Sequence, residues 1–309
     1  MNGEQFFSTV RLLFVVGKGG VGKTSVAATL AVAAARSGRS VLIADVDGRH
    51  GAAAAFGVHD LSYDERVLVA AASGRGPIAA RTITADDALV EYLADHGMGR
   101  LARKLASNGV VDVIATATPG IKDLLVLGKV KQLVTEAKHD LVILDTPASG
   151  HAVTFLRSAG ALARSVSSGR IRRQADEVLE LLGDHQRCRV LLVTVAEETP
   201  VNETIETAFT LEDEIGVALT PVVVNAVLEV PMAVPAGALA RLDPAERAAV
   251  TTALAVERSR AEAQGVQRSR LANALPLAQL VLPERAGTRL GADDFEALSD
   301  ALQASLAEL

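Results

Sequence analysis

Cysteine is nearly absent from this chain, because Cys188 is the one thiol among 309 residues. A lone thiol can neither close a disulfide within the chain nor supply the cysteine pair of a structural zinc site. We therefore expect no intramolecular disulfide and no zinc. The apolar run 190–195 follows Cys188 closely, so we expect this cysteine at the start of a core strand.

Long apolar runs and an excess of basic charge are also missing. No apolar stretch approaches the roughly 18–20 residues that cross a bilayer, and residues 1–10 lack a basic-then-apolar secretion signal. The formal net charge is -6, from 31 Lys and Arg against 37 Asp and Glu. This balance indicates no general attraction to nucleic acid or anionic lipid. We expect a cytoplasmic protein with no nucleic-acid partner and no stable membrane insertion.

The composition favours a large packed core. Hydrophobic residues make up 49% of the chain and charged residues 22%, which is typical of a globular protein and not of a disordered one. The length fits one large α/β domain or two small ones. We interpret residues 1–309 as one domain.

The most informative stretch is 17–25, Gly-Lys-Gly-Gly-Val-Gly-Lys-Thr-Ser. An apolar run at 12–16 precedes it and an alanine-rich run at 26–36 follows, which predicts strand, loop and helix. The stretch fits G-x-x-x-x-G-K-[ST], a loop whose backbone N–H groups cradle phosphate beside the positive end of a helix. The residues expected to contact a nucleotide are Gly17, Gly19, Gly20, Val21, Gly22, Lys23, Thr24 and Ser25.

Two further sets of side chains point to the same ligands, ATP and Mg²⁺. Lys23 is expected to reach the β- and γ-phosphates, and the Thr24 hydroxyl to ligate Mg²⁺. Four apolar residues precede Asp145, an arrangement that holds Mg²⁺ through water or through Thr24. Asp45 and Asp47 follow the apolar run 41–43, at the end of a strand where open α/β sheets bind ligands.

Other segments follow local patterns. Helical spacing predicts helices over 86–105, over 121–134 and over 202–215, the last with Asn202 as N-cap. A further helix begins after Asp243, which is followed by Pro and Glu in capping positions. Strands are expected at 77–84, 221–225 and 279–283, and a short helix at 52–57. One apolar helix face near the C-terminus comprises Phe295, Leu298, Leu302 and Leu306.

Several phrases resemble those of a known family. Residues 17–25 resemble the phosphate loop of dimeric nucleotide-switch ATPases, in which a second lysine, here Lys18, reaches the partner's nucleotide. Residues 145–156, Asp-Thr-Pro-Ala-Ser-Gly-His-Ala-Val-Thr-Phe-Leu, are similar to D-T-A-P-T-G-H-T-L-R-F-L, the switch signature of the ArsA-type and tail-anchored-protein targeting ATPases, with Pro147 and Ala148 transposed. Residues 119–123 resemble the P-G-I-D-E phrase of that branch.

This resemblance covers nearly the whole chain and implies a doubly wound, mostly parallel P-loop NTPase sheet of the α/β class. A helical subdomain is implied at about residues 86–135. The implied activity is Mg²⁺-dependent ATP hydrolysis that switches a dimer between conformations. The partner subunit is either an identical chain or a paralogous ATPase, and the dimer acts on a client protein or an anion.

The resemblance also implies roles for individual residues. Lys18, Lys23 and Asp47 are the implied catalytic groups, with Asp47 orienting the attacking water. Asp45 is the competing candidate, and Gly48-Arg49 replaces the family's Pro-Ala after Asp47. The implied switch residues are Asp145, Ser149, Gly150 and His151. The implied contacts to the adenine are Asn225, Pro283 and Glu284.

Two other classes of P-loop protein remain as alternatives. A positioning ATPase of the septum-site or plasmid-partition class lacks the phrase at 145–151, and a biosynthetic ligase would phosphorylate a small metabolite. Arsenite is disfavoured as a ligand because a soft metalloid needs a thiolate cluster. Met98 is the one methionine in 86–135, which weakens a Met-rich client groove. The arginines from Arg157 to Arg173 form a basic cluster whose role stays open.

Overall fold

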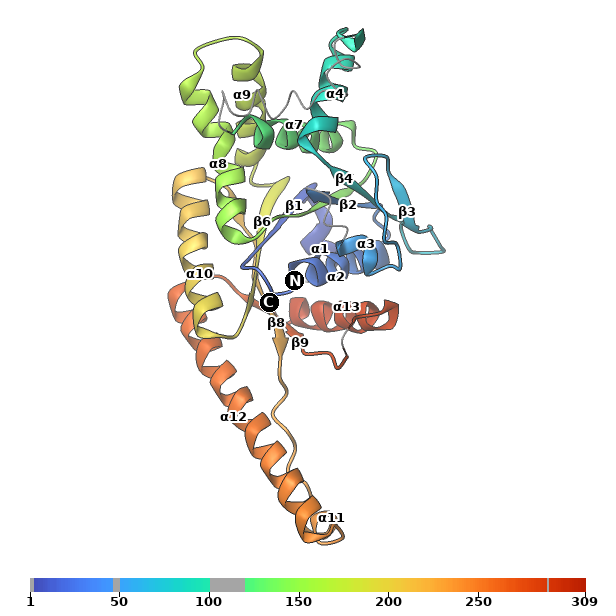
Figure 1. Cartoon of the computed structure of the whole chain (residues 1–309), viewed down its shortest axis with the longest axis vertical. Coiled ribbons are helices and arrows are strands. Elements are labelled where there is room, and N and C mark those ends of the chain that lie inside the picture. The colour runs from blue at the N-terminus through green and yellow to red at the C-terminus, as the bar shows by residue number, and fades with distance from the viewer. Residues whose placement is uncertain (1–2, 47–50, 101–119, 288) are drawn as a thin grey trace.

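The computed structural model describes residues 3–46, 51–100, 120–287 and 289–309 (Figure 1). The strands in this part of the chain form one nine-stranded sheet in the order β3-β4-β2-β5-β1-β6-β8-β9, with β7 beside β6. They are β1 (Leu12–Val16), β2 (Val41–Val46), β3 (Arg66–Val69), β4 (Ile78–Ile83), β5 (Leu141–Asp145), β6 (Cys188–Val195), β7 (Ala218–Leu219), β8 (Val222–Val227) and β9 (Gln279–Pro283). Every pairing is parallel except that of β3 with β4. The mostly parallel α/β sheet expected from the sequence is confirmed.

Helices cover both faces of the sheet (Figure 1). They are α1 (Gly3–Ser8), α2 (Lys23–Arg36), α3 (Gly51–Ala54), α4 (Ala85–Asp95), α7 (Ile121–Glu136), α8 (Ser149–Ser165), α9 (Arg170–Gly183), α10 (Glu198–Phe209) with a π-helical continuation (Thr210–Ile215), α11 (Ala236–Leu239), α12 (Pro244–Ala274) and α13 (Ala292–Ala307). None of the described helices combines the length and apolarity needed to cross a bilayer.

The two hydrophobic cores follow from the alternation of side chains along the buried strands. On β1, Leu13 and Val15 pack with α2 and α13 on one face. Leu12, Phe14 and Val16 pack with α7 and α8 on the other. The expected apolar face of α13 is buried. Both faces are covered, which explains why the central strands are continuously apolar in sequence.

Strands β1 and β5 are parallel neighbours. The chain leaves β1 toward the β3 edge of the sheet and leaves β5 toward the β9 edge. The helix after β1, α2, lies on one face of the sheet, and the helix after β5, α8, lies on the other. The carboxyl ends of two such strands are the place where doubly wound sheets bind their ligands. Residues 17–22 and Asp145 meet at this edge.

Some local expectations were wrong. The helix expected over 86–105 is interrupted after Asp95, because Gly97 adopts a left-handed φ of 76° that breaks the turn. Residues 99 and 100 are helical again, and residues 101–105 lie outside the described part of the chain. Strand β3 was not expected, and the helix at 52–57 is shorter, ending at Ala54. The residue Asn202 lies inside α10, which begins four residues earlier in the chain, at Glu198.

A long helical arm leaves the body of the molecule at the carboxyl side of β8 (Figure 1). It consists of α12, which spans 31 residues, and α11 at its tip. The expected start of α12 is confirmed, since Asp243 accepts from the backbone N–H of Glu246 and the Glu246 carboxylate accepts from the backbone of Asp243. Of the described α12 residues, Ala261 and Leu271 alone are buried.

A buried ionic cluster joins α4 and α7 to the sheet. Lys129 of α7, whose side chain is 5% exposed, lies 2.6 Å from the Glu91 carboxylate of α4. Tyr63 donates its hydroxyl to the same carboxylate, and the Arg81 guanidinium of β4 lies 4.3 Å from the centre of the Tyr63 ring. Burial alone would raise the pKa of Glu91, but the hydrogen bonds from Lys129 and Tyr63 hold it below its ordinary value.

This cluster predicts that Glu91→Gln destabilises the protein more than Lys129→Met does. The first variant leaves the Lys129 charge buried without a carboxylate, which costs roughly 3–5 kcal/mol in a fully buried pair. The cost is smaller here because the Glu91 side chain is 31% exposed. The second variant removes the buried charge itself. Urea unfolding near neutral pH measures both free energies, and a Lys129→Met variant as unstable as Glu91→Gln would contradict the argument.

The same pair predicts a pH dependence. Because the folded-state pKa of Glu91 is lowered, its contribution to stability is present above the ordinary Glu pKa of about 4.3. It is lost as the pH falls through the lower folded-state value. The stability difference between wild type and Glu91→Gln should therefore shrink in acid.

Candidate functional site

The glycine loop lies between β1 and α2 as expected. Gly20 and Gly22 have φ angles of 88° and 89°, a left-handed conformation that glycine adopts without a steric penalty. Gly22 is the N-cap of α2, and Lys23 is its first residue. The N–H groups of the loop and of the first turn of α2 form a backbone surface of a kind suited to an anion.

Neighbouring elements hold the loop through its carbonyl oxygens. Gly17 O accepts from the backbone N–H of Ser149 at 2.9 Å and from Lys23 Nζ at 2.9 Å. Lys23 Nζ also donates to Lys18 O at 3.1 Å. The side-chain Nδ2 of Asn225 donates to Val21 O at 3.0 Å. Residues from α8 and β8 thus fix a loop that begins many residues earlier in the chain.

Two glycines are also required by close packing. A Cβ on Gly17 would overlap the backbone carbonyl of Val193 in β6. A Cβ on Gly22 would overlap the side chain of Asn225. By contrast, the nearest atom to a Cβ on Gly19 would be the Ala148 Cβ, at 4.0 Å.

Thr24 and Asp145 bring two side-chain oxygen donors together at the loop. The Thr24 hydroxyl donates to Asp145 Oδ2 at 2.6 Å, and Asp145 is buried at the end of β5. Hard oxygen donors suit Mg²⁺, which is usually held by one or two carboxylates together with substrate phosphates. No group of three or more His, Cys, Asp or Glu side chains suited to a metal occurs among the described residues. The Thr24 and Asp145 pair therefore fits Mg²⁺.

Asp45 lies beside Asp145, because the two residues are partners in the parallel register of β2 and β5. It is buried. Asp47, with Gly48, Arg49 and His50, lies outside the described residues, and β2 ends at Val46. On the other side of that gap, Gly51 contacts Thr24, since a Cβ on it would lie 2.9 Å from Thr24 Cγ2.

The residues after β5 turn directly into α8. Thr146 donates its hydroxyl to Val15 O at 2.7 Å, and Ser149 is the first residue of α8. Gly150 and His151 follow in the first turn and are exposed. Because Ser149 N also donates to Gly17 O, the start of α8 is attached to the glycine loop.

Lys18 has a partner that the sequence did not indicate. Its Nζ lies 2.6 Å from Oε1 of Glu203 in α10. The two residues are 185 positions apart, and no motif connects them. The pair is about two-thirds shielded from solvent, with the side chains 34% and 37% exposed.

The residues expected to contact an adenine lie together at the ends of β8 and β9. Asn225 is in β8 and Pro283 ends β9, and Glu284 N donates to Val227 O at 2.9 Å. Gln264 of α12, which no sequence motif indicated, donates from its amide to Ala226 O at 3.1 Å and accepts from Leu228 N at 2.8 Å. Gln264 thereby fixes the chain that leaves β8.

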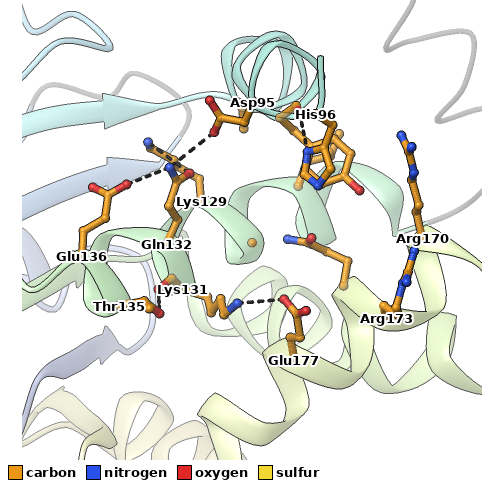
Figure 2. A pocket seen from close by; sticks show the side chains of 15 residues that line it. Asp95, His96, Lys129, Lys131, Gln132, Thr135, Glu136, Arg170, Arg173 and Glu177 are labelled. Carbon is orange, nitrogen blue, oxygen red and sulfur yellow. Dashed lines mark hydrogen bonds and ion pairs between the residues drawn. The ribbon is translucent and has the colours of Figure 1, made fainter. Parts of the chain in front are cut away.

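A cavity of ≈ 530 Å³ lies away from the loop, between α4, α7 and α9 (Figure 2). Figure 2 shows Arg170 and Arg173 on one side of it and Asp95 and Glu136 on the other. Gln132 donates to the Glu136 carboxylate at 2.8 Å. The cavity is lined by residues of both charges, so its polarity does not favour one class of ligand.

Part of the basic cluster is paired within the chain. Arg157 forms an ion pair with Glu214 in the π-helical segment. Arg172 Nε lies 2.9 and 2.8 Å from the two carboxylate oxygens of Asp176.

Comparison with known proteins connects this geometry to one family. The sequence model of the anion-transporting ATPase family matches residues 10–172, just over half of the chain. A relative named ATPase BagA, from Mycobacterium tuberculosis, is 36% identical over 206 residues, which are 64% of this chain and 60% of the relative. ATPase GET3 from Chaetomium globosum is 29% identical over 160 residues, 52% of this chain and 46% of the relative.

A third relative, from Halobacterium salinarum, is named a putative arsenical pump-driving ATPase. It is 27% identical over 237 residues, which cover 71% of this chain and 36% of that protein. The chain therefore spans about 60% or less of the length of these curated relatives. The matched stretch 10–172 includes the glycine loop, Thr24 and Asp145 but not Glu203 or Asn225.

The loop packing predicts different costs for three alanine substitutions. Gly17→Ala should lose about 1–3 kcal/mol of unfolding free energy, because the new Cβ meets a fixed backbone carbonyl. Gly20→Ala has open space but a left-handed φ, and should lose about 1–2 kcal/mol. Gly19→Ala is the matched control and should stay within about 0.5 kcal/mol of wild type. Urea unfolding tests the order, and a Gly17→Ala variant as stable as Gly19→Ala would refute it.

Proposed function

Because the chain belongs to the anion-transporting ATPase family, we propose that it hydrolyses ATP with Mg²⁺ and uses the cycle as a conformational switch. The observation that supports this most directly is the bond between Ser149 N and Gly17 O. It joins the glycine loop to α8, so a change in the loop is passed to a helix that packs against α7 and α9.

The loop supplies the charge for phosphoryl chemistry. Lys23 lies over the loop, where its ammonium would neutralise charge developing on the γ-phosphoryl group. Thr24 and Asp145 would hold Mg²⁺, which when bound supplies further positive charge between the phosphates. Asp47 is the proposed residue that orients the attacking water, and its neighbour in the described chain, Gly51, contacts Thr24.

The nucleotide base is proposed to lie against Asn225, Pro283 and Glu284. An asparagine amide can both donate to and accept from adenine. In this structure the Nδ2 of Asn225 donates to Val21 O, so the same side chain supports the loop. The two polar atoms of the Asn225 amide thus have different partners. Nδ2 donates to Val21 O, and Oδ1 is proposed to accept a hydrogen bond from the base.

The working unit is proposed to be a dimer that acts on a protein or an anion. The description of the family as anion-transporting motivates the anion, and the resemblance of residues 17–25 and 145–156 to the dimeric switch ATPases motivates the dimer and the protein client. Arsenite is not the proposed partner. Burial raises the pKa of the Cys188 thiol to about 12, and a buried, protonated thiol is a poor ligand.

Two variants test the assignment of roles. Lys23→Ala should lose ATP binding, because it removes the cation that holds the phosphates. Asp47→Asn should bind ATP normally and lose turnover, since it affects the water and not the phosphates. Isothermal titration and steady-state hydrolysis measure the two quantities. Tight ATP binding by Lys23→Ala, or near-normal turnover by Asp47→Asn, would contradict the proposal.

A mixing experiment tests whether Lys18 acts on the partner's nucleotide. A cation supplied across a two-fold interface contributes on the order of 10³–10⁵ in rate in related systems. Lys18→Ala and Asp47→Asn should each be inactive alone, but mixed dimers hold one complete site. Under random exchange, activity should recover to about a quarter of wild type. No recovery, with exchange verified, would show that Lys18 acts within its own subunit or that the natural partner is another chain.

A further inference from the structure

The ion pair between Lys18 and Glu203 restrains the loop's second lysine within its own subunit. Nζ and Oε1 lie 2.6 Å apart, slightly closer than the roughly 2.7–2.9 Å that is usual for a charge-assisted N–H···O bond. In the proposed function the same ammonium must reach the nucleotide of another subunit. The contact with Glu203 is therefore one that has to open.

Both members of the pair are held by rigid elements. Lys18 follows Gly17, whose carbonyl accepts two hydrogen bonds and whose Cα faces the Val193 carbonyl. Glu203 lies in α10 next to Thr204, which is buried. Because both backbones are already anchored, forming the pair orders the two side chains but no further backbone. The contact therefore depends on the position that α10 takes after β6.

We propose that Glu203 is a positioning residue that restrains Lys18 in the free subunit and competes with the partner's ATP for it. This rests on the proposed function, in which Lys18 acts across the dimer interface. The exchange replaces one carboxylate by a polyphosphate of higher negative charge. A partner subunit without a triphosphate presents less negative charge to Lys18, so Lys18 then stays with Glu203. Glu203 thereby makes formation of the closed dimer depend on the nucleotide.

The size of the effect follows from the exposure of the pair. Partly exposed ion pairs contribute up to about fivefold in an equilibrium constant. A symmetric dimer opens two such pairs, so removing the carboxylate should tighten the dimer by up to about 25-fold. Because exposed charges are screened by salt, the gain should shrink as ionic strength rises. A purely structural role for Glu203 would not produce that salt dependence.

The test compares Glu203→Gln with Glu206→Gln. Both substitutions keep the side-chain shape and remove one negative charge from α10, but Glu206 lies one turn further along and is exposed. The first readout is acylation of lysine amines in the nucleotide-free protein, resolved for each lysine by mass spectrometry. Lys18 should be acylated faster in Glu203→Gln than in wild type, and at the wild-type rate in Glu206→Gln.

The second readout is the dimer dissociation constant with Mg²⁺ and a non-hydrolysable ATP analogue, from sedimentation equilibrium at two salt concentrations. Glu203→Gln should dimerise more tightly than wild type and Glu206→Gln, with a smaller difference at high salt. Unchanged acylation of Lys18, or a Glu203→Gln dimer no tighter than a wild type that does dimerise, would overturn the proposal.

Failure of the underlying function has a different signature. In that case wild type stays monomeric with the analogue and Lys18→Ala hydrolyses ATP at the wild-type rate. The proposal that Glu203 competes with the partner's ATP would then be wrong as well. Faster acylation of Lys18 in Glu203→Gln would still show that the ion pair itself forms.

Discussion

The site depends on where the carbonyl oxygens of the glycine loop are bound. Gly17 O accepts from Ser149 N and Lys23 Nζ, and Val21 O accepts from the Asn225 amide. A peptide group is planar, and its N–H points away from its C=O. Holding the carbonyls from the α8 and β8 sides therefore leaves the N–H groups directed at the ligand edge. The anion site is thus made by tertiary contacts as much as by the glycines.

The same contacts place the loop at a junction between the two helical layers. Its preceding strand, β1, packs on α2 and α13 through one face and on α7 and α8 through the other. The ionic cluster around Lys129 then joins α7 to α4 and to β4 of the sheet. A displacement of Gly17 would consequently shift close-packed neighbours on both faces of the sheet. Packed cores move between discrete arrangements more readily than they deform continuously.

Much of this structure could be predicted from local sequence patterns. The strand, loop and helix over 12–36, the Asp243 cap and the apolar face of α13 each depend on residues a few positions apart, and all were found. The errors came from longer-range or backbone effects. Gly97 ended α4 early through a positive φ, and β3 is an edge strand of four residues, too short for its apolar residues to indicate a strand and partly exposed. Glu203 and Gln264 were not predicted because they belong to no motif themselves and lie far in sequence from the residues that they contact.

The arm formed by α12 gives the molecule a long lever whose base is next to the proposed adenine site. Gln264 fixes that base to Ala226 and Leu228, the residues that follow Asn225 by one and three positions. The helix from Gln264 back to Pro244 measures about 30 Å at 1.5 Å per residue, so a tilt of about 10° at the base shifts the tip by about 5 Å. Small adjustments beside the base site are therefore geometrically magnified at α11, far from the glycine loop.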